Sequence, residues 1–369
     1  MKVMCVLGTR PEAIKMAPVV MELRRRSGVE TIVCSTGQHR QMLDQVLNLF
    51  GIEPDFDLNV MSEAQTPSKV ASMVLERIEP VLREVRPDWV LVQGDTTTAA
   101  AAALAAFYNR SKVGHVEAGL RTRDKWQPFP EEINRRIVGV IADLHFAPTQ
   151  RARENLLSEN VPPDRILVTG NTVIDALLWV AERPPSEEAR KLIESLELSE
   201  ETRLVLVTAH RRENHGEPLR RICEALRMIA ERYGDSVRIV YPVHLNPNVW
   251  GPVHEMLEGI PNVKLLPPLD YEPMVRLMQR AYLILTDSGG LQEEAPALGV
   301  PVLVLRNTTE RPEGIAAGTA KLVGTDVDRI TSEAFRLLDD PEERGRMARA
   351  INPYGDGRAS KRIVEALLS

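Results

Sequence analysis

The stretch WVLVQGDTTTAAAAALAAFYNRSKVGHVE, residues 89–117, contains one complete strand-helix-strand unit. Apolar and β-branched residues predict strands at Trp89–Gln93 and Val113–Glu117, and the alanine-rich run between them predicts a helix. The near-unbroken apolar stretch Ala99–Phe107 is nine residues long, whereas a helix that spans a bilayer needs about 20. We therefore expect a small-residue helix packed against a parallel sheet.

The same alternation of short β-branched runs with amphipathic segments of helical length continues in both halves of the chain. In the first half, further strands are predicted at Lys2–Leu7, Glu30–Ser35, Leu144–Ala147 and Ile166–Thr169. In the second half, strands are predicted at Leu204–Thr208, Arg238–Pro242, Val263–Leu266, Leu283–Thr286 and Val302–Leu305. The repeated architecture predicts an α/β protein with two Rossmann-like domains that face each other across a cleft.

A domain boundary is expected near residues 170–200, where the composition changes. Residues 182–202 contain Pro184 and Pro185 and a short charge-rich helix, which is typical of a linker. We assign residues 1–170 to an N-terminal domain and residues 171–354 to a C-terminal domain. The last helix, at 355–369, has no strand after it, and we assign it to the N-terminal domain.

The composition is that of an ordinary globular protein and excludes several classes. The 369 residues carry 46 Lys and Arg against 52 Asp and Glu, a formal charge of −6, whereas nucleic-acid-binding proteins usually have a basic excess. Cys5, Cys34 and Cys223 are odd in number and widely separated, which argues against a disulfide framework and a paired metal site. The N-terminal apolar run is too short for a signal peptide, whose core has about 7–15 residues. We therefore expect a cytoplasmic protein without a nucleic-acid or membrane partner.

Polar residues follow the predicted strands at their carboxyl ends, where open α/β sheets bind ligands. The segments are GTRPEAIK at 8–15, GD at 94–95, EAGLR at 117–121, HRREN at 210–214, PVH at 242–244 and DSGGLQEE at 287–294.

The segment DSGGLQEE follows a strand and opens a helix. The backbone N–H groups of Ser288, Gly289 and Gly290 are therefore expected to point at an anionic diphosphate, and Glu294 can accept hydrogen bonds from a ribose. The alternative is a helix capped by Ser288 whose glycines serve only a tight turn. The sequence contains neither GxGxxG nor GxxxxGK[ST], so a nicotinamide cofactor or an ATP-driven step has no support.

Cationic side chains near the predicted strand ends are candidates for clamping phosphate oxygens. They are Arg10, Lys15 and Arg311, and the alternative for each is a solvated charge. His210 ends a strand before two arginines, which suggests phosphate contact or proton transfer. A metal site with His215 or His244 lacks paired ligand spacing. The segment PDFD at 54–57 resembles a sugar-nucleotide metal motif, but it follows a helix and is interpreted as a loop.

Asp95, Glu117 and Glu131 are the acid-base candidates. Asp95 and Glu117 end consecutive strands, one unit apart, so both carboxylates are expected at the same sheet edge, where close carboxylates push their pKa values apart. The alternatives are structural. Asp95 would cap the alanine-rich helix, Glu117 would pair with Arg121 or Arg123, and Glu131 and Glu132 would favour the first turn of a helix.

Seven motifs carry a resemblance to the non-hydrolysing UDP-N-acetylglucosamine 2-epimerase family. They are GTRPEAIKMAP at 8–18, GDTTT at 94–98, HVEAGLRT at 115–122, PFPEEINRR at 128–136, TAHRREN at 208–214, TDSGGLQEEAP at 286–296 and TTERPEG at 308–314. The resemblance runs from residue 2 to the final helix. It implies a glycosyltransferase-B-like fold with a UDP-binding C-terminal domain, and a usually dimeric cytoplasmic enzyme without a cofactor. It also implies interconversion of UDP-N-acetylglucosamine and UDP-N-acetylmannosamine for surface polysaccharide synthesis.

The resemblance also implies residue roles. Asp95, Glu117 and Glu131 perform acid-base work, with His210 assisting UDP departure. The diphosphate side is bound by Arg10, Lys15, His210, Ser288, Gly289, Gly290 and Arg311, and the ribose by Glu294. Activation by a second substrate molecule implicates Gln38, Gln41, Arg211, Arg212 and His244. Two positions depart from the family pattern, Ala64, where Arg is frequent, and Leu269, where some relatives have Gln.

Three alternatives remain open at this stage. One is a glycosyltransferase of the same fold, although no amphipathic helix suited to a lipid-linked acceptor is evident in the first domain. The second is a hydrolysing epimerase that releases free sugar. The third is a catalytically silent sugar-nucleotide sensor.

Overall fold

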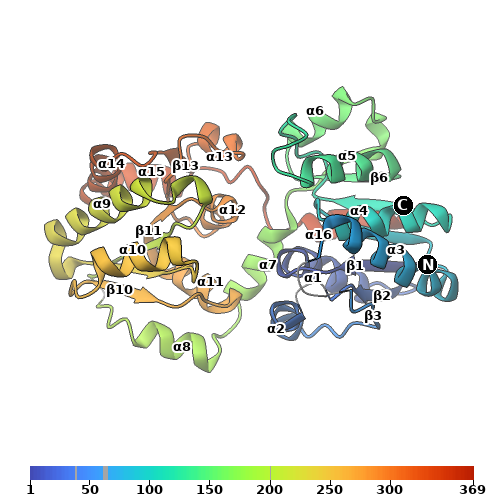
Figure 1. Cartoon of the computed structure of the whole chain (residues 1–369), viewed down its shortest axis with the longest axis horizontal. Coiled ribbons are helices and arrows are strands. Elements are labelled where there is room, and N and C mark those ends of the chain that lie inside the picture. The colour runs from blue at the N-terminus through green and yellow to red at the C-terminus, as the bar shows by residue number, and fades with distance from the viewer. Residues whose placement is uncertain (38–39, 61–64, 200) are drawn as a thin grey trace. The chain divides into compact units, whose positions relative to one another are not determined.

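The computed structural model describes residues 1–37, 40–60, 65–199 and 201–369, and the chain forms two compact units (Figure 1). The first unit comprises Met1–Ala176 and Tyr354–Ser369, and the second comprises Leu177–Pro353. The first boundary thus lies beyond residue 170, because the segment that follows β7 still makes hydrogen bonds within the first unit. The N–H of Asn171 donates to the carbonyl of Tyr354 at 2.7 Å.

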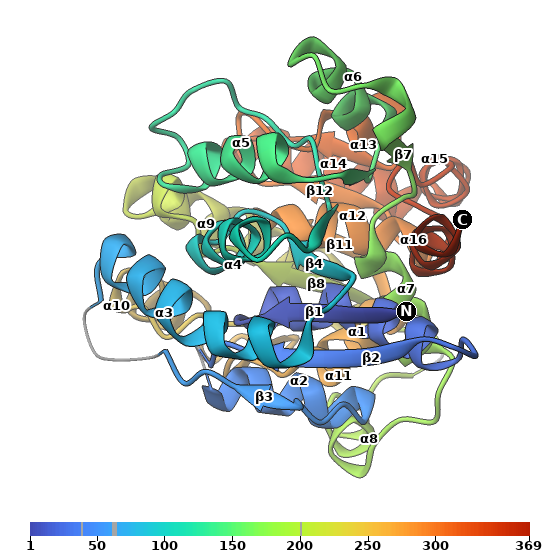
Figure 2. The same cartoon turned by 90° about the vertical axis from the view of Figure 1, so that its right-hand side faces the viewer.

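The first unit contains a seven-stranded parallel sheet in the order β3-β2-β1-β4-β5-β6-β7. Figure 2 shows β1 between β2 and β4, with β3 beyond β2. Its strands are β1 Lys2–Leu7, β2 Glu30–Ser35, β3 Phe56–Asp57, β4 Trp89–Gln93, β5 Lys112–Val116, β6 Leu144–Ala147 and β7 Ile166–Val168. Its helices are α1 Arg10–Arg24, α2 Arg40–Phe50, α3 Pro67–Val85, α4 Thr97–Tyr108, α5 Glu131–Ile141 and α6 Gln150–Ser158. A short 3-10 turn, η1, lies at Pro163–Arg165.

The alanine-rich helix α4 is buried as predicted. It packs on β4 and β5 and contacts both α3 and α5. Eight of its residues are buried, seven of them alanines. Small side chains let this helix approach the sheet closely on one side while neighbouring helices cover the other.

The second unit repeats the architecture with a six-stranded parallel sheet in the order β10-β9-β8-β11-β12-β13. Its strands are β8 Arg203–Thr208, β9 Val237–Pro242, β10 Val263–Leu266, β11 Ala281–Thr286, β12 Val302–Val304 and β13 Ala320–Leu322. Its helices are α8 Glu187–Glu194, α9 Glu217–Tyr233, α10 Pro247–Leu257, α11 Tyr271–Arg280, α12 Gly289–Ala297, α13 Pro312–Ala317, α14 Val327–Asp339 and α15 Pro341–Ala348. The 3-10 turns η2 and η3 lie at Arg212–Asn214 and Gly234–Ser236, and α7 Thr172–Ala181 runs across the boundary between the units.

The last helix, α16 Ala359–Leu368, belongs to the first unit, where it packs against α1 (Figure 1). Asp175 caps its amino terminus. One carboxylate oxygen accepts the N–H of Ala359 at 3.1 Å, and the other accepts the N–H of Ser360 at 2.8 Å. Burial raises the pKa of Asp175, although these hydrogen bonds oppose the shift.

All strands expected from the sequence are present, which confirms the α/β class with two parallel sheets. Two edge strands are additional. β3 lies in the PDFD segment, so its interpretation as a loop was wrong, and β13 had no counterpart in the prediction. Both have only two or three residues and are defined by pairing with β2 and β12, which a short residue pattern does not reveal.

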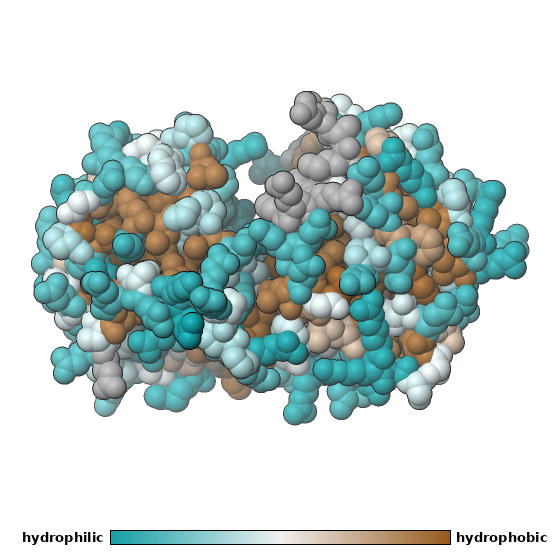
Figure 3. Space-filling view, turned by 90° about the horizontal axis from the view of Figure 1, so that it is seen from below, coloured by the Kyte–Doolittle hydropathy of each residue, from teal (hydrophilic) through white to brown (hydrophobic). Residues whose placement is uncertain are grey.

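Each unit has its own apolar core, built mainly from its strands and the helices that cover them. On the face drawn in Figure 3, hydrophilic side chains predominate and apolar ones lie among them, as on most globular proteins. Among the residues that the structure describes, no helix combines the length and apolar character needed to cross a membrane.

Candidate functional site

Glu117 lies directly after β5 in a left-handed backbone conformation, with φ of 63°, and only 8% of the residue is exposed. Its carboxylate accepts hydrogen bonds from three side chains. Nζ of Lys15 lies 2.7 Å from each oxygen. Nδ2 of Asn171 donates to Oε1 at 2.9 Å, and Nε2 of Gln93 donates to Oε2. The carboxylate is thus held from α1, from the end of β4 and from the segment after β7.

Lys15 is therefore the ionic partner of Glu117. The structural alternative, in which Glu117 pairs with Arg121 or Arg123, was wrong in its choice of partner. Arg121 instead pairs with Glu159 at 2.7 Å. The sequence associated Lys15 with diphosphate only, and its contact with a carboxylate adds a second task.

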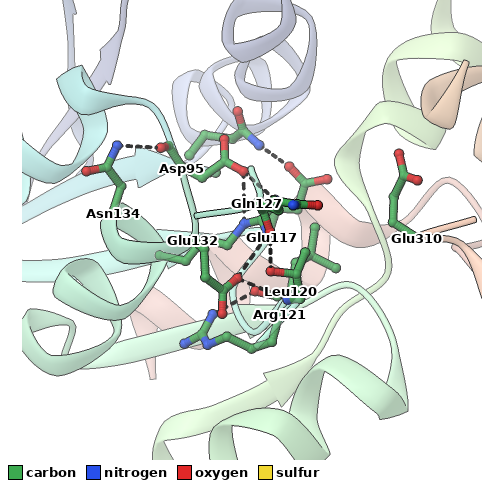
Figure 4. A network of polar contacts seen from close by, with 12 residues as sticks. Asp95, Glu117, Leu120, Arg121, Gln127, Glu132, Asn134 and Glu310 are labelled. Carbon is green, nitrogen blue, oxygen red and sulfur yellow. Dashed lines mark hydrogen bonds and ion pairs between the residues drawn. The ribbon is translucent and has the colours of Figure 1, made fainter. Parts of the chain in front are cut away.

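Asp95 lies at the neighbouring strand end, because β4 and β5 pair with Gln93 opposite Val116. Its carboxylate forms an ion pair with Arg135 at 2.7 Å. Nδ2 of Asn134 donates to its backbone carbonyl at 2.9 Å (Figure 4). The structural alternative for Asp95 was wrong, since Thr96 caps α4 by accepting the N–H of Ala99.

His115, on β5, holds the turn after β4 that carries Asp95. Its Nε2 lies 2.8 Å from the carbonyl of Gly94, and because a carbonyl only accepts, Nε2 carries the proton. The N–H of Gly94 in turn donates to the carbonyl of Val116 at 3.0 Å. Burial lowers the pKa of His115 to about 3, so this histidine is neutral and structural rather than a proton donor.

Glu12 is a buried carboxylate that the sequence reasoning missed. It accepts the N–H groups of Gly8 and Thr9 at 3.0 and 2.7 Å and the hydroxyl of Thr96 at 2.6 Å, so it joins the loops after β1 and β4. Burial raises its pKa against these hydrogen bonds. The T-x-x-E pattern at Thr9–Glu12 was the available signal, since it forms a capping box at the start of α1.

Glu131 and Glu132 begin α5 but have different surroundings. Glu132 is buried and accepts the N–H groups of Thr122 and Arg123 at 3.0 and 3.1 Å. Burial opposes its ionisation, but these hydrogen bonds and Arg135 give a net lowering of the pKa. Oε2 of Glu131 is buried and has no hydrogen-bond partner in the described part of the chain. Glu132 therefore holds the loop before α5, whereas one oxygen of Glu131 lacks a partner among the described residues.

In the second unit, His210 follows β8 next to Asp287, which follows β11. The backbone N–H groups of His210 and Arg211 both donate to Oδ2 of Asp287 at 2.8 Å. The imidazole of His210 stacks on that of His244, with ring centroids 5.5 Å apart. Burial lowers the pKa of His210, and Asp287 opposes this shift. Asp287 opens the segment DSGGLQEE, but the sequence reasoning assigned it no role.

The glycine-rich turn differs in one respect from the expectation. The N–H of Ser288 donates to Oγ1 of Thr286 at 2.9 Å, so it is already engaged. The alternative, a side-chain cap by Ser288, is also absent from the described contacts of α12. Gly289 and Gly290 form the first turn of α12, where backbone N–H groups have no partner within the helix.

Glu294 and Arg311 both contact side chains of their own unit. Tyr271 donates its hydroxyl to Oε1 of Glu294 at 3.1 Å, and Arg311 forms an ion pair with Glu293. Arg211 pairs with Glu310 at 2.9 Å. Glu310 also pairs with Arg306, and although burial acts in the opposite direction, the two arginines help hold its pKa at about 2.

For the remaining candidate residues, the structure gives at most their place in the fold. Gln38 and Ala64 lie outside the described residues, and Gln41 is described only as part of α2. Arg10 begins α1, Arg212 begins η2, and Leu269 lies between β10 and α11. No group of three or more His, Cys, Asp or Glu residues suited to a metal ion occurs within the described ranges.

Two parallel sheets with polar strand ends define the chain as an α/β protein of the glycosyltransferase-B-like class. A glycosyltransferase from Rickettsia africae shares this fold, with a TM-score of 0.66 at 15% identity, over 99% of this chain and 97% of that chain. The family model for UDP-N-acetylglucosamine 2-epimerase matches residues 21–368. The chain belongs to this family and is an enzyme of the isomerase type that the family name describes.

Two relatives illustrate the similarity. The UDP-N-acetylglucosamine 2-epimerase of Salmonella typhimurium is 55% identical over 372 residues, covering 100% of this chain and 99% of the relative. The crystal structure of UDP-GlcNAc 2-epimerase from Neisseria meningitidis bound to UDP-GlcNAc has a TM-score of 0.89 at 49% identity, with 100% of both chains covered.

Proposed function

We propose that the chain reversibly epimerises carbon 2 of UDP-N-acetylglucosamine to give UDP-N-acetylmannosamine, by elimination and re-addition of UDP through 2-acetamidoglucal. The observation that carries this proposal is the pair of strand-end carboxylates, Asp95 and Glu117, with Glu131 as a third carboxylate. The two strand-end groups have different cationic partners, Arg135 and Lys15, which suits a division into acid and base roles. The bound sugar nucleotide of the Neisseria meningitidis relative supports the substrate class.

Carbon 2 of the sugar has no neighbouring carbonyl, so simple removal and return of its proton is unfavourable. In the elimination, an enzyme base takes the proton from carbon 2, and the electron pair of that C–H bond forms the double bond between carbons 1 and 2. The bond from carbon 1 to the phosphate oxygen breaks, and its electron pair leaves with UDP. Re-addition of UDP at carbon 1, with protonation of carbon 2 on the opposite face, gives the epimer without water or an oxidant.

The first unit supplies the acid-base groups in this proposal. Glu117 is held by three donors and can receive or return a proton only in a fixed orientation, which favours directional transfer. Lys15 compensates the charge of Glu117, and with Arg10 it also attracts the diphosphate. Glu131 retains an unpartnered oxygen among the described contacts, which a sugar hydroxyl can satisfy.

The second unit supplies the UDP side. The first turn of α12, at Gly289 and Gly290, presents backbone N–H groups suited to phosphate oxygens. Arg311 adds a cation, Ser288 a hydroxyl, and Glu294 an acceptor for ribose. His210 assists departure of UDP by donating to the phosphate oxygen. We further propose activation by a second UDP-N-acetylglucosamine, with Gln38, Gln41, Arg211, Arg212 and His244 as candidate contacts.

We also propose a homodimer that works in the cytoplasm, in surface polysaccharide synthesis. Ile133, Ile137 and Val140 lie on one face of α5 and are 37%, 40% and 88% exposed, and α5 packs beside α4, which ends in exposed Phe107 and Tyr108. A second copy would cover this apolar face. Ile137→Asp should give a monomer in sedimentation equilibrium. Val168→Asp, at an exposed site on β7, is the control and should remain a dimer. If both variants remain dimers, this face of α5 is not the dimer interface.

The reaction is tested by incubating the chain with UDP-N-acetylglucosamine alone. Epimerisation predicts a mixture with UDP-N-acetylmannosamine and no net UDP by phosphorus NMR. Free sugar with accumulating UDP would indicate a hydrolysing epimerase. An unchanged substrate that still binds would indicate a sensor, and turnover only with an added acceptor would indicate a glycosyltransferase.

A further inference from the structure

Asp287 is a fully buried carboxylate at the end of β11, and its two oxygens have very different surroundings. Oδ2 accepts three hydrogen bonds. The donors are the N–H of His210 at 2.8 Å, the N–H of Arg211 at 2.8 Å and Nδ2 of Asn214 at 2.9 Å. These three hydrogen bonds help to anchor the loop after β8, and they fill the capacity of this oxygen.

The other oxygen of Asp287, Oδ1, lacks such donors. It is buried and has no hydrogen-bond partner among the described residues. A buried carboxylate oxygen without a donor is unfavourable. Nδ1 of His210 lies 3.7 Å from Oδ1, slightly beyond the length of a hydrogen bond. His210 itself is reachable by a ligand, since 43% of its side chain is exposed.

We propose that Asp287 is a positioning residue for His210. It accepts a hydrogen bond from the proton on Nδ1, so that Nε2 is left to exchange a proton with the phosphate oxygen that leaves carbon 1 or returns to it. A carboxylate only accepts, so contact with Oδ1 requires the proton on Nδ1. The role of Nε2 in the reaction rests on the proposed function. The contact between Asp287 and Nδ1 does not.

The charged neighbours of His210 make this contact consequential. Burial is the largest cause of the lowered pKa of His210, and the nearby His244, Arg211 and His215 lower it further. Asp287 is the carboxylate that raises this pKa. When the bond from carbon 1 to oxygen breaks, its electron pair stays on the phosphate oxygen. In the doubly protonated form of His210, the proton on Nε2 moves to that oxygen, Nδ1 keeps its own proton, and the ring changes from cationic to neutral beside Asp287.

The test is Asp287→Asn in the full chain. Asn can keep a carbonyl oxygen for the three donors at the Oδ2 position, but its amide group then faces Nδ1 of His210. Nδ1 must accept, and the proton of the neutral ring moves to Nε2. Nitrogen-15 NMR of the imidazoles reports the tautomer, and His210→Gln identifies the signal by removing it.

In the unsubstituted protein we expect neutral His210 to carry its proton on Nδ1. In Asp287→Asn we expect the Nε2 tautomer and a titration midpoint lower by about one pH unit or more. Thr208→Val is the control, because it removes the hydroxyl that bonds Thr286 at 2.6 Å beside the same strand end. It keeps the backbone carbonyl of Thr208, which accepts the N–H of Asp287 at 3.1 Å, and it should leave the tautomer unchanged. An Nε2 proton in the unsubstituted protein overturns the proposal even if Asp287→Asn fails to fold.

Turnover separates this proposal from the proposed function. With both intact, Asp287→Asn lowers kcat by roughly 100-fold or more, the usual contribution of a positioned acid, while KM changes little. A tautomer that switches while kcat stays the same would leave the contact between Asp287 and His210 standing and remove His210 from the reaction. An unchanged tautomer with a lowered kcat would overturn the positioning role.

Discussion

Nζ of Lys15, on α1, lies 2.7 Å from both carboxylate oxygens of Glu117, which follows β5. The side chain of Glu117 is 5% exposed and that of Lys15 is 19% exposed, so water screens this pair far less than a surface pair. Glu117, one of the acid-base candidates of the first unit, therefore depends on a cation from another element of the same unit.

Lys15→Met should destabilise the protein by roughly 1–3 kcal/mol, because it leaves a buried carboxylate without its cation. It should also lower turnover. The free energy of unfolding from urea titration checks the first result. Lys361→Met removes an exposed cation, 3.9 Å from Glu365 in the same unit, and should cost less than about 1 kcal/mol. If the two variants lose the same unfolding free energy, the contact of Lys15 with Glu117 stabilises the protein no more than an exposed ion pair does.

Asp95→Asn and Glu117→Gln should keep UDP binding and lose turnover by roughly 100-fold or more, the range expected for a lost acid or base. Both substitutions keep the size of the side chain, so calorimetry with UDP should give dissociation constants close to that of the unsubstituted protein. Glu159→Gln is a matched control, because it makes the same exchange at a glutamate that pairs with Arg121 and has no proposed role in the reaction. Unchanged turnover in both test variants would exclude these carboxylates from the mechanism.

The sequence predicted the strands and the two-sheet architecture because periodicity and strand ends are local properties. It also brought Asp95 and Glu117 to one sheet edge, since they end strands that are consecutive in the chain. It could not predict the pair of Lys15 and Glu117. That contact depends on β4 lying between β1 and β5, an order decided by packing rather than by spacing.

Two further residues were within reach of the strand-end rule. Asn171 follows β7, and Asp287 follows β11. The neighbours of Asp287 attracted the functional interpretation because glycines and charged side chains are stronger motif signals, whereas the residues around Asn171 were interpreted only as a strand end and a domain boundary. What distinguishes Asn171 and Asp287 is a buried polar contact, and burial at a loop position is a tertiary property that composition does not encode.

Stability should fall as the pH is lowered from about 6.5 toward 4 because of two buried histidines. Burial lowers the pKa of His115 to about 3 and that of His145 to about 4. Below about pH 6.5 the unfolded chain binds protons at both sites and the folded chain does not. Each histidine therefore costs about 1.4 kcal/mol of unfolding free energy per pH unit in that window.

The measurement is the urea midpoint as a function of pH in the unsubstituted protein and in the double variant His115→Gln/His145→Gln. The double variant should show a shallower acid dependence, although it can be less stable at pH 7. Glu12 and Asp175 have raised pKa values and act in the opposite direction, but they are present in both proteins and cancel in the comparison. Parallel curves would contradict the assignment.

Gly119→Ala should destabilise the first unit and reduce turnover, because the loop after Glu117 packs tightly at this glycine. Gly119 has φ of 89°, and an added Cβ would lie 2.2 Å from the carbonyl oxygen of Ala152 on α6. A left-handed alanine costs about 1–2 kcal/mol, and forced overpacking adds about 1–3 kcal/mol. Gly28 separates the two effects, since its φ is 80° and an added Cβ would meet no other atom within 4 Å. Gly28→Ala should show only the smaller loss in urea unfolding and keep full turnover. If the two variants lose the same stability, the backbone conformation alone accounts for the effect, and the contact with α6 does not hold the Glu117 loop.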